Sequence, residues 1–595
     1  MIKKILFPTF LVILAIILYF NPNFKTIAAG VAVLLFGVIL LEEGFKVFTK
    51  GPLQFFLKQT TDKLYKSITA GALVTTFIQS SSLVSVITIS FISAGLISLS
   101  GGLGLIFGAN IGTTATAWLV AGFGLKIKIA SLAMPMLIFG LIFSFKKNLI
   151  FKGIGNVLAG LGFFFLGIYY MKEGFDVFKE FIDLSQFAVS GFLGAIIYTG
   201  LGIIITTILQ SSSAALALIL TALATGQIEY ENALALAIGA NIGTTITAIL
   251  GSLGSNIAGK RLAVAHLIFN VSTGLIALIF IFPLADFVNY LSEFLNFKET
   301  DYTLKLALFH TIFNVLGVVL MIPFIRKLEL FLLKIFKEIE NKGIDEPKYL
   351  NEAILKFPGT LISAVLEESK YLYKNAIFEI VAHALNIHRD DIKSDINIKK
   401  IIKQSDKKIP IDIEEFYYSK VKNIYGQIIN FVTRGQQELK LTKQQNKRLS
   451  ELKLANRRMV EIIKDTKELE KNVSVFLVSD NEEIKNEYNK FRKKVVKVLR
   501  VIYLFRKKED KDEYFNQLMI LKREAKTALK EDNKSLDRLI RKNLITTDMA
   551  SSLVNDNVTV NDLIKKLIQV AELLYSEKDV ILETVIYRPS PKKKN

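Results

Sequence analysis

The chain has 595 residues, of which 51% are hydrophobic, and it carries a formal net charge of +20, four histidines and no cysteine. Absence of cysteine excludes a disulfide scaffold, thiolate metal sites and cysteine catalysis, and four histidines disfavour imidazole-rich metal sites. The basic excess comes without an aromatic–basic recognition motif, so no nucleic-acid partner is expected. Because no Walker loop or catalytic triad is visible, we expect no enzymatic activity and no catalytic residues.

The composition divides at about residue 330. Residues 1–330 contain 21 Lys or Arg and 14 Asp or Glu, whereas the rest contain 53 and 40. The first part is too apolar for a soluble domain and the second has a charged, soluble composition. We therefore predict an all-α protein with a polytopic helical membrane domain over 1–330, a linker over 331–350, a helical bundle over 351–588 and a basic tail over 589–595.

Apolar runs long enough to cross a bilayer occur, in chain order, at about 5–20, 27–41, 129–145, 153–170, 262–282 and 305–325. Two further stretches, 68–122 and 192–258, are too long for one span each and contain clusters of Gly, Ser, Thr, Asn and Gln. Lys3 and Lys4 precede the first run, but no small-x-small cleavage site follows it. We expect it to be a retained helix rather than a signal peptide.

The charges between the runs predict an orientation in the cell membrane. Segments 42–66 and 146–152 are net basic, whereas 172–189 and 283–304 are net acidic. Since basic loops favour the cytoplasmic side, a multi-pass arrangement with both termini in the cytoplasm is predicted. The pair Lys126 and Lys128 is the exception to this pattern.

A sequence repeat relates two parts of the apolar region, about 27–145 and 153–282, with a last span at 305–325. At an offset of 131 residues, Gly71, Thr75–Thr76 and Gln79–Ser82 recur as Gly202, Thr206–Thr207 and Gln210–Ser213, and Gly108–Thr114 recurs as Gly239–Thr245, followed by Thr116 and Thr247. The loops that follow the matching upstream segments have opposite net charge. That reversal is typical of inverted-topology repeats.

Polar clusters inside apolar sequence are costly unless they face one another, an ion or water. Close helix packing is the alternative interpretation, but the recurrence of both patterns at one spacing favours a binding site. Oxygens of Gln, Asn, Ser and Thr suit Na⁺, and hydroxyls and helix N-termini can donate to an oxyanion. No Lys or Arg lies in either cluster. A bound anion would therefore need co-bound cations to offset its charge.

The doubled Gln-Ser-Ser-Ser segment, followed each time by Gly-x-Asn-x-Gly-Thr-Thr, resembles the type II sodium/phosphate cotransporter family. The resemblance implies two re-entrant hairpins that meet near the midplane, with Na⁺ as the coupling ion. It assigns the phosphate and sodium sites to Gln79, Ser80, Ser81, Ser82, Asn110, Thr113, Thr114, Gln210, Ser211, Ser212, Ser213, Asn241, Thr244, Thr245 and Thr247.

Thr76 and Thr207 are candidate supporting residues, as are two His-x-x-Phe-Asn matches that contain His266, Asn270, His310 and Asn314. Bonding between neighbouring helices is the alternative role for the second group. Met136 stands where some family members carry an acidic residue linked to an additional sodium. By resemblance, this implies fewer coupling ions and electroneutral transport.

The charged region shows helical periodicity at about 350–388, 412–443, 445–474, 482–507, 511–542 and 558–585, which predicts two antiparallel bundles. Glu461 and Asp465 share one helix face and resemble the E-x-x-x-D signature of the PhoU family. The resemblance implies a cytoplasmic PhoU-like domain and a metal at these two residues. Ser552 stands before Asp556 at the corresponding second place. The alternative is an acidic edge paired with Arg457, Arg458 and Lys464.

These features lead to a sodium-dependent phosphate carrier that works by alternating access, with a regulatory soluble domain. Inorganic phosphate, sodium and the lipid bilayer are the expected partners, and phosphate-signalling proteins or a second copy of the chain are candidates. Two alternatives stay open at this point. One is a phosphate exporter or a carrier of another small oxyanion, and the other is a membrane-tethered phosphate sensor without flux.

Overall fold

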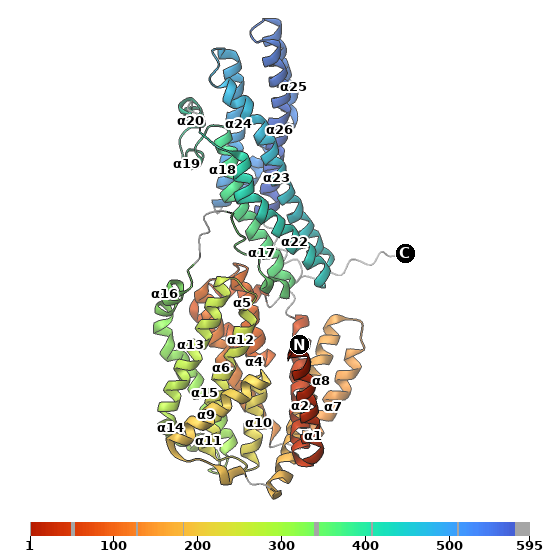
Figure 1. The fold of residues 1–595 in the computed structure, drawn as a ribbon, viewed down its shortest axis with the longest axis vertical. Coiled ribbons are helices and arrows are strands. Elements are labelled where there is room, and N and C mark those ends of the chain that lie inside the picture. Colours follow the sequence, from red (N-terminus) through yellow and green to blue (C-terminus); the bar gives the residue numbers. More distant parts are fainter. Residues whose placement is uncertain are drawn as a thin grey trace. The chain divides into compact units, whose positions relative to one another are not determined.

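The computed structural model describes residues 2–48, 54–125, 129–181, 184–337, 344–405, 409–507 and 511–576. These residues form helices without any strand (Figure 1), which confirms the all-α prediction. They fall into two compact units: residues 1–338 with 351–353, and residues 339–350 with 354–595. Lys126, Lys128 and the tail 589–595 lie outside the described residues, as does part of the expected linker.

The first unit contains α1 (Ile2–Phe20), α2 (Pro22–Phe48), α3 (Gln54–Gln59), α4 (Leu64–Ile78), α5 (Ser81–Ser93), α6 (Leu99–Trp118), η2 (Leu119–Gly124), α7 (Ile129–Ser144), α8 (Leu149–Phe181), η3 (Leu184–Phe187), α9 (Gly191–Leu209), α10 (Ser212–Ala224), α11 (Tyr230–Gly243), α12 (Thr245–Ser252), α13 (Ile257–Ile279), α14 (Ile281–Phe294), α15 (Tyr302–Met321), η4 (Ile322–Phe324) and α16 (Ile325–Ile335).

Within the described residues, seven helices are long and apolar enough to cross a bilayer: Phe24–Phe45, Leu99–Gly124, Leu149–Lys179, Gly191–Leu209, Tyr230–Ser252, Ile257–Ile279 and Tyr302–Ile335. The runs expected at 5–20 and 129–145 form the shorter apolar helices Leu11–Phe20 and Leu132–Ser144. The chain is thus a multi-pass membrane protein. The last apolar helix continues to Ile335, beyond the predicted start of the linker, because α16 extends the helical path of α15 through η4.

Each long polar stretch is divided by a Gln-Ser break. Gln79 and Gln210 have left-handed backbones, with φ of 58° and 52°, at the ends of α4 and α9. The next residue then starts a new helix as its N-cap: Ser80 accepts the Leu83 amide and Ser211 accepts the Ala214 amide, both at 3.2 Å. Apolar helices are therefore interrupted at the same place in both repeats.

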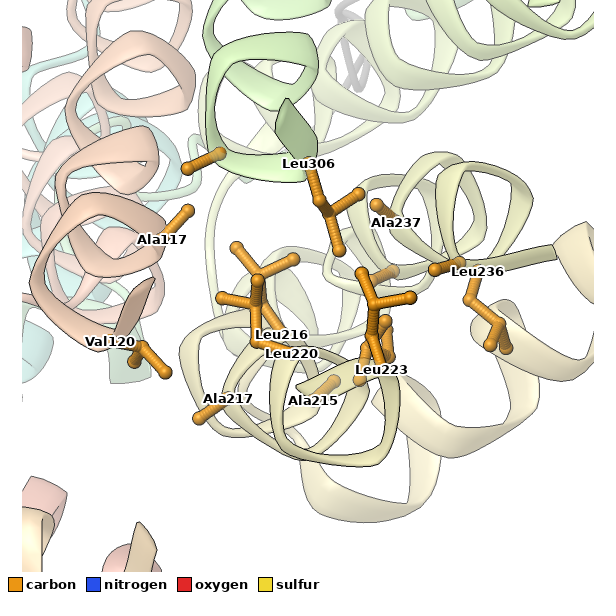
Figure 2. Close-up of a cluster of buried hydrophobic side chains, with 14 of the residues drawn as sticks. Ala117, Val120, Ala215, Leu216, Ala217, Leu220, Leu223, Leu236, Ala237 and Leu306 are labelled. Carbon is orange, nitrogen blue, oxygen red and sulfur yellow. The ribbon is translucent and has the colours of Figure 1, made fainter. Parts of the chain in front are cut away.

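The core of the first unit surrounds α10 (Figure 2). Leu216 and Leu220 of α10 pack among buried side chains of α6, α11 and α15, including Ala117, Ala237 and Leu306. The small residues flanking these leucines let the neighbouring helices approach closely. This packing fixes α10, and with it the second Gln-Ser break, beside the helix that carries the first repeat's Gly-Ala-Asn motif.

Glycines set the closest helix contacts, and they do so in both repeats. A Cβ added at Gly71 of α4 would lie 2.2 Å from the Leu105 carbonyl oxygen of α6, and one at Gly202 of α9 would lie 2.3 Å from that of Leu236 of α11. Contacts this short exclude any side chain. The repeat thus preserves backbone packing as well as polar residues.

The second unit contains α17 (Pro358–Leu372), η6 (Tyr373–Ile377), α18 (Phe378–Ala384), α19 (Arg389–Lys393), α20 (Ile398–Gln404), α21 (Ile413–Phe416), η7 (Tyr417–Val421), α22 (Lys422–Glu438), α23 (Lys443–Phe476), α24 (Glu482–Lys507), α25 (Lys511–Arg541) and α26 (Thr547–Tyr575), while η5 (Glu352–Lys356) begins in the first unit.

The expected helices at 445–474, 482–507 and 511–542 agree closely with α23, α24 and α25. Helix α26 begins eleven residues earlier than predicted, because Thr546 caps it by accepting the Met549 amide. Helix α23 packs against α26 as well as against α17, α18 and α22, so it joins the two predicted sets of helices.

Glu368 of α17 is a fully buried carboxyl of the second unit. Its Oε2 accepts the Tyr349 amide at 2.7 Å, and the amides of Lys348 and Leu350 also lie against it. Burial raises the pKa of Glu368 to about 7, although these amides act in the opposite direction. Between about pH 4.5 and pH 7, the folded protein therefore keeps the Glu368 carboxyl protonated, whereas the unfolded chain releases this proton.

This buried carboxyl predicts a stability that falls as pH rises. Because the folded pKa lies above the unfolded value of 4.5, the stabilisation is complete below about pH 4.5 and is lost as pH rises through 7. The difference corresponds to about 3 kcal/mol. We expect Glu368→Gln to remove this loss, so that the variant melts above the wild type at pH 8 in thermal unfolding of the full chain. The control is Glu367→Gln at the neighbouring residue, which forms a partly exposed ion pair with Lys370. This variant should keep the wild-type pH dependence of stability. If both variants changed the pH dependence equally, the loss of stability could not be assigned to Glu368.

Candidate functional site

The first Gln-Ser break lies against the motif that follows it in sequence. Gln79 Oε1 accepts the Thr116 hydroxyl of α6 at 2.8 Å. Its Nε2 donates to the Thr76 carbonyl at the end of α4. Because the left-handed backbone at residue 79 turns this side chain back along α4, the amide group is held in place at both ends.

The two repeats meet at this point. Thr116 Oγ1 lies 3.1 Å from Ser213 Oγ of α10, and Ser213 Oγ donates to the Gln79 carbonyl at 3.4 Å. Thr247 of α12 donates to Ser82 of α5 at 3.2 Å. In each case a serine of one repeat is hydrogen-bonded to a threonine of the other repeat. The two bonded residues are 97 residues apart in the first pair and 165 in the second.

The remaining predicted site residues are mostly buried around this junction. Thr113 and Thr114 donate their hydroxyls to backbone carbonyls of α6 at 2.9 and 2.8 Å, and Thr245 of α12 donates to the Ile242 carbonyl of α11 at 2.7 Å. A hydroxyl that donates to the backbone keeps its lone pairs for another partner, as a cation ligand requires. Less than a tenth of the residue surface is exposed at Ser80, Ser81, Ser212, Ser213, Asn110, Asn241 and Thr244.

One small pocket lies at the junction. A cavity of about 10 Å³ is lined by Gln79, Ser213 and apolar residues of α2 and α8, among others. That volume holds about one water molecule. This pocket therefore has no room for a phosphate ion in this conformation.

The two breaks are not equivalent in their contacts. Gln210 is exposed, and its side chain has no hydrogen bond to any residue in the described ranges, whereas Gln79 is half-buried and held at both ends. Thr76 is exposed, with its hydroxyl 3.5 Å from the Gly112 carbonyl, and Thr207 is half-buried. The sequence repeat is thus nearly exact while the hydrogen bonding differs between its copies.

The histidine–asparagine pairs also differ. Asn241 of α11 donates to Asn314 of α15 at 2.7 Å and lies 3.2 Å from His310 Nε2, so this set bonds two helices together. Within α13 of the second repeat, the side chains of His266 and Asn270 bond each other at 3.0 Å and have no other hydrogen-bonded side chain among the described residues. Asn110 Nδ2 and Asn270 Oδ1 are buried without a hydrogen-bond partner among the described residues.

Sequence reasoning missed two sets of residues. Thr75 and Thr206, at the same offset of 131, are 1% and 0% exposed, and neither hydroxyl has a hydrogen-bond partner within the described part of the chain. The prediction chose the next threonine in each case, because sequence alone does not show which side of a helix faces inward.

Glu42 is the second omission. We assigned it to a basic loop over 42–66, but it lies inside α2, where its Oε1 accepts the Ser80 hydroxyl. This corrects the loop boundary: α2 continues to Phe48. The only sequence signal for this carboxylate was the pair Glu42 and Glu43 at the end of an apolar run.

We expect Glu42→Gln to lower the sodium affinity of any sodium-coupled process at this site by about tenfold, since a carboxylate is replaced by a neutral amide of the same shape. The measurement is the sodium concentration that gives half-maximal phosphate uptake. Glu43→Gln is the matched control, because Glu43 is exposed on the next position of α2. Equal sodium dependence in both variants would show that Glu42 serves only to hold Ser80, the N-cap of α5.

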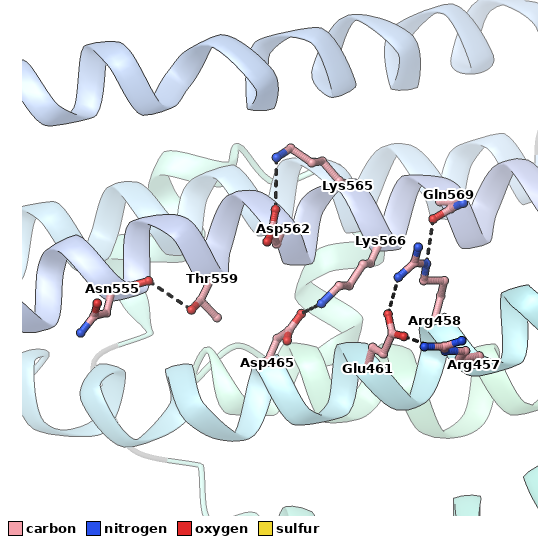
Figure 3. Close-up of polar contacts among 10 residues, drawn as sticks. All are labelled: Arg457, Arg458, Glu461, Asp465, Asn555, Thr559, Asp562, Lys565, Lys566 and Gln569. Atoms are coloured by element: carbon pink, nitrogen blue, oxygen red, sulfur yellow. Dashed lines mark hydrogen bonds and ion pairs between the residues drawn. The ribbon is translucent and has the colours of Figure 1, made fainter.

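The two acidic residues Glu461 and Asp465 of the second unit form ion pairs with arginine and lysine side chains (Figure 3). Glu461 pairs with Arg457 at 3.1 Å and with Arg458, and Asp465 pairs with Lys566 of α26 at 2.6 Å. Burial raises the pKa of Asp465 while Lys566 opposes the rise. The described residues contain no group of three or more His, Asp or Glu able to hold a metal. These contacts favour the ion-pair alternative, with Lys566 in the place we assigned to Lys464, and metal binding stays a prediction.

Known proteins are similar to the part of the chain that holds this junction. The Na+/Pi-cotransporter family model matches residues 33–173 and 187–321, which hold both breaks and both following motifs. YqeW of Bacillus subtilis, whose name assigns no function, is 30% identical over 319 residues, covering 52% of this chain and 92% of YqeW.

Two further relatives are named as candidate inorganic phosphate export proteins. YjbB of Salmonella typhimurium is 28% identical over 344 residues and YjbB of Escherichia coli K12 is 28% identical over 345, in each case 57% of this chain and 61% of the relative. The matched part of this chain thus spans less than two thirds of either YjbB protein. No solved structure matches the chain. The family consists of transporters rather than enzymes, and the chain belongs to the Na+/Pi-cotransporter family.

Proposed function

We propose that the chain carries inorganic phosphate across the cell membrane together with Na⁺, by alternating access between the two repeats. The observation that carries this proposal is the junction at which Thr116, Ser213 and Gln79 join the two Gln-Ser breaks. Only residues brought together from both repeats can form and dissolve one site as the repeats move relative to each other.

The site has parts suited to each ion. Helices α5 and α10 begin at the breaks and present free amides and the positive ends of their dipoles, which favour an oxyanion. The donating threonines and Glu42 present oxygen lone pairs, which favour Na⁺. Since neither cluster contains Lys or Arg, sodium would supply the positive charge that lowers the cost of holding phosphate.

Movement is required because the pocket between Gln79 and Ser213 has room for about one water. The hydrogen bonds of Thr116 with Ser213 and of Thr247 with Ser82 would have to open for phosphate to enter. We propose the two helix pairs α4–α5 and α9–α10 as the re-entrant hairpins that open. The unequal contacts of Gln79 and Gln210 would then exchange between the two end states.

Reconstitution tests the function. Purified full-length protein in liposomes should take up radiolabelled phosphate under an inward Na⁺ gradient and not under an equal K⁺ gradient. Reversing the gradient gives the preferred direction, which decides between uptake and the export role in the names of the YjbB proteins. Phosphate binding without flux under any gradient would overturn the carrier and favour the sensor. Absence of membrane current during uptake would support electroneutral transport.

Orientation is proposed with both termini in the cytoplasm. Since the chain has no cysteine, single cysteines need no altered background. Lys147→Cys, in a net basic segment, should react with a membrane-impermeant maleimide only after the cells are opened. Asn296→Cys, in the acidic segment 283–304, should react on intact cells. The opposite pattern would invert the topology.

We propose that the second unit is a PhoU-like regulatory domain. The segment 351–353 belongs to the first unit, where Ala353 donates its amide to the Gly254 carbonyl and accepts the Ser90 hydroxyl of α5, both at 3.0 Å. Truncation after residue 353 keeps these bonds and truncation after residue 338 removes them. Flux that changes with both truncations supports regulation by the bundle, and flux that changes only with the shorter chain assigns the effect to the segment on α5.

A further inference from the structure

A cavity of the second unit lies between α24, α25 and α26 and has a volume of about 310 Å³. It is separate from the acidic pair of Figure 3 and plays no part in the proposed transport mechanism. Four lysines line it, Lys490, Lys493, Lys494 and Lys497, against one glutamate, Glu524. Their spacing of three and four residues places all four ammonium groups on one face of α24.

A lysine row on a helix is ordinarily a solvated face, and part of this row is neutralised. Lys490 pairs with Glu487 at 2.6 Å, and Lys497 lies 3.7 Å from Glu524. Lys493 is exposed and has no ion pair with a described residue. The lining therefore sets four lysines against one glutamate, and the side chains of Lys490, Lys493 and Lys497 are also exposed to solvent.

A second observation indicates that the hollow is a site. Asn561 of α26 lines the cavity and is 1% exposed. Its Nδ2 donates to the Asn557 carbonyl at 2.8 Å, which fixes the orientation of the amide. The Oδ1 atom is then buried without a hydrogen-bond partner among the described residues. An unsatisfied buried acceptor costs about 1–3 kcal/mol, and a ligand N–H or O–H would satisfy it once the atoms that cover this oxygen move aside.

The rest of the lining is apolar. Val498, Leu521, Ala525 and Ile564 contribute from the same three helices. A ligand of this cavity thus needs an anionic group for the lysines, an apolar body and a hydrogen-bond donor for Asn561. Inorganic phosphate has no apolar part, and a fatty acid has no hydrogen-bond donor beside its apolar chain. The volume is at the lower end of the range for small-molecule sites, about 300–1,000 Å³.

We propose that this cavity binds a nucleotide, with its phosphates at the lysine row and its base or ribose against the apolar lining and Asn561. Lys493 and Lys494 supply point charges to the phosphates. Asn561 Oδ1 accepts a base amino group or a ribose hydroxyl. The second unit would then report nucleotide levels, independently of phosphate at the transport junction.

The test is calorimetric titration of the full chain in detergent, without sodium, using ATP, GTP, CTP and UTP, then the monophosphate and nucleoside of the tightest binder, and inorganic phosphate. We expect at least one triphosphate to bind, with its monophosphate weaker and its nucleoside and inorganic phosphate each at least about tenfold weaker. Lys493→Ala/Lys494→Ala should weaken binding about tenfold or more. Ala525→Phe, which fills the cavity from a residue that is 4% exposed, should abolish it.

The control is Lys447→Ala/Lys453→Ala, which removes the same charge from exposed positions of α23 and should leave nucleotide binding unchanged. Circular dichroism and the thermal midpoint establish that each variant is folded. No binding of any triphosphate, an unchanged affinity in the Lys493/Lys494 variant, or inorganic phosphate binding as tightly as the triphosphate would each overturn the proposal. Sodium-dependent phosphate uptake without nucleotide should be the same in the Lys493/Lys494 variant and the wild type, so failure here leaves the transport proposal standing.

Discussion

Gln79→Ala is expected to reduce sodium-dependent phosphate uptake by about 100-fold in liposomes while the protein stays folded. The substitution removes the amide oxygen that accepts the Thr116 hydroxyl and the amide nitrogen that binds the end of α4. A loss of 100-fold corresponds to about 2.7 kcal/mol, the scale of two hydrogen bonds at a closed polar site. The left-handed backbone at residue 79 costs alanine about 1–2 kcal/mol, which a folded protein of this size tolerates.

Two further variants separate the effect of side-chain length at residue 79 from the effect of its left-handed backbone. Asn is among the residues that adopt the left-handed region most readily, but its side chain is one methylene shorter, so Gln79→Asn should keep the fold and still lose most uptake. Gln59→Ala, at an exposed glutamine of α3, is the control and should transport normally. Gln210→Ala probes the equivalent break, whose side chain is exposed in this conformation. Normal sodium-dependent uptake by both Gln79→Ala and Gln210→Ala would remove the breaks from the mechanism.

Gly202→Ala is expected to destabilise the first unit by about 3 kcal/mol, the upper end of overpacking costs. The new Cβ would lie 2.3 Å from the Leu236 carbonyl oxygen, so α9 and α11 would have to separate. A lower thermal midpoint in detergent and poorer yield from membranes would measure this effect. Gly71→Ala, the equivalent position of α4, should behave alike, since its Cβ meets the Leu105 oxygen at 2.2 Å.

Gly200→Ala is the matched control on the same helix. A Cβ there meets no atom within 4 Å, and replacing a helical glycine by alanine stabilises by about 1 kcal/mol. Its thermal midpoint should equal or exceed that of the wild type. If Gly200→Ala and Gly202→Ala melted alike, helix approach at Gly202 would not limit the stability of this unit.

The large-scale organisation could be predicted from sequence because it depends on local composition and on repetition. The change in charge density near residue 330 separated the two units, and the offset of 131 identified the paired breaks. Even the break itself has a local cause: a glutamine in the left-handed region ends one helix and a serine N-cap begins the next. Helices α23, α24 and α25 were predictable for the same reason, since their apolar spacing is regular.

The site was only partly predictable, because helical neighbours along the chain face different directions. Sequence named Thr76 as a candidate supporting residue, whereas packing buries Thr75 instead. It placed Glu42 in a loop, although α2 carries this carboxylate to Ser80, 38 residues away. In the second unit Asp465 pairs with Lys566, 101 residues away, rather than with a neighbour on its own helix.

The sequence by itself determined that a nearly charge-free polar pattern occurs twice in an apolar, helical chain, since composition and repetition are properties of the chain alone. Only the tertiary structure decided which of those polar groups meet. Thr116 reaches Ser213, and Thr247 reaches Ser82, because close packing around α10 and the repeat glycines brings separate helices together. The physical reason is that a hydrogen bond forms over about 3 Å, a distance set by how helices pack and not by their separation in sequence.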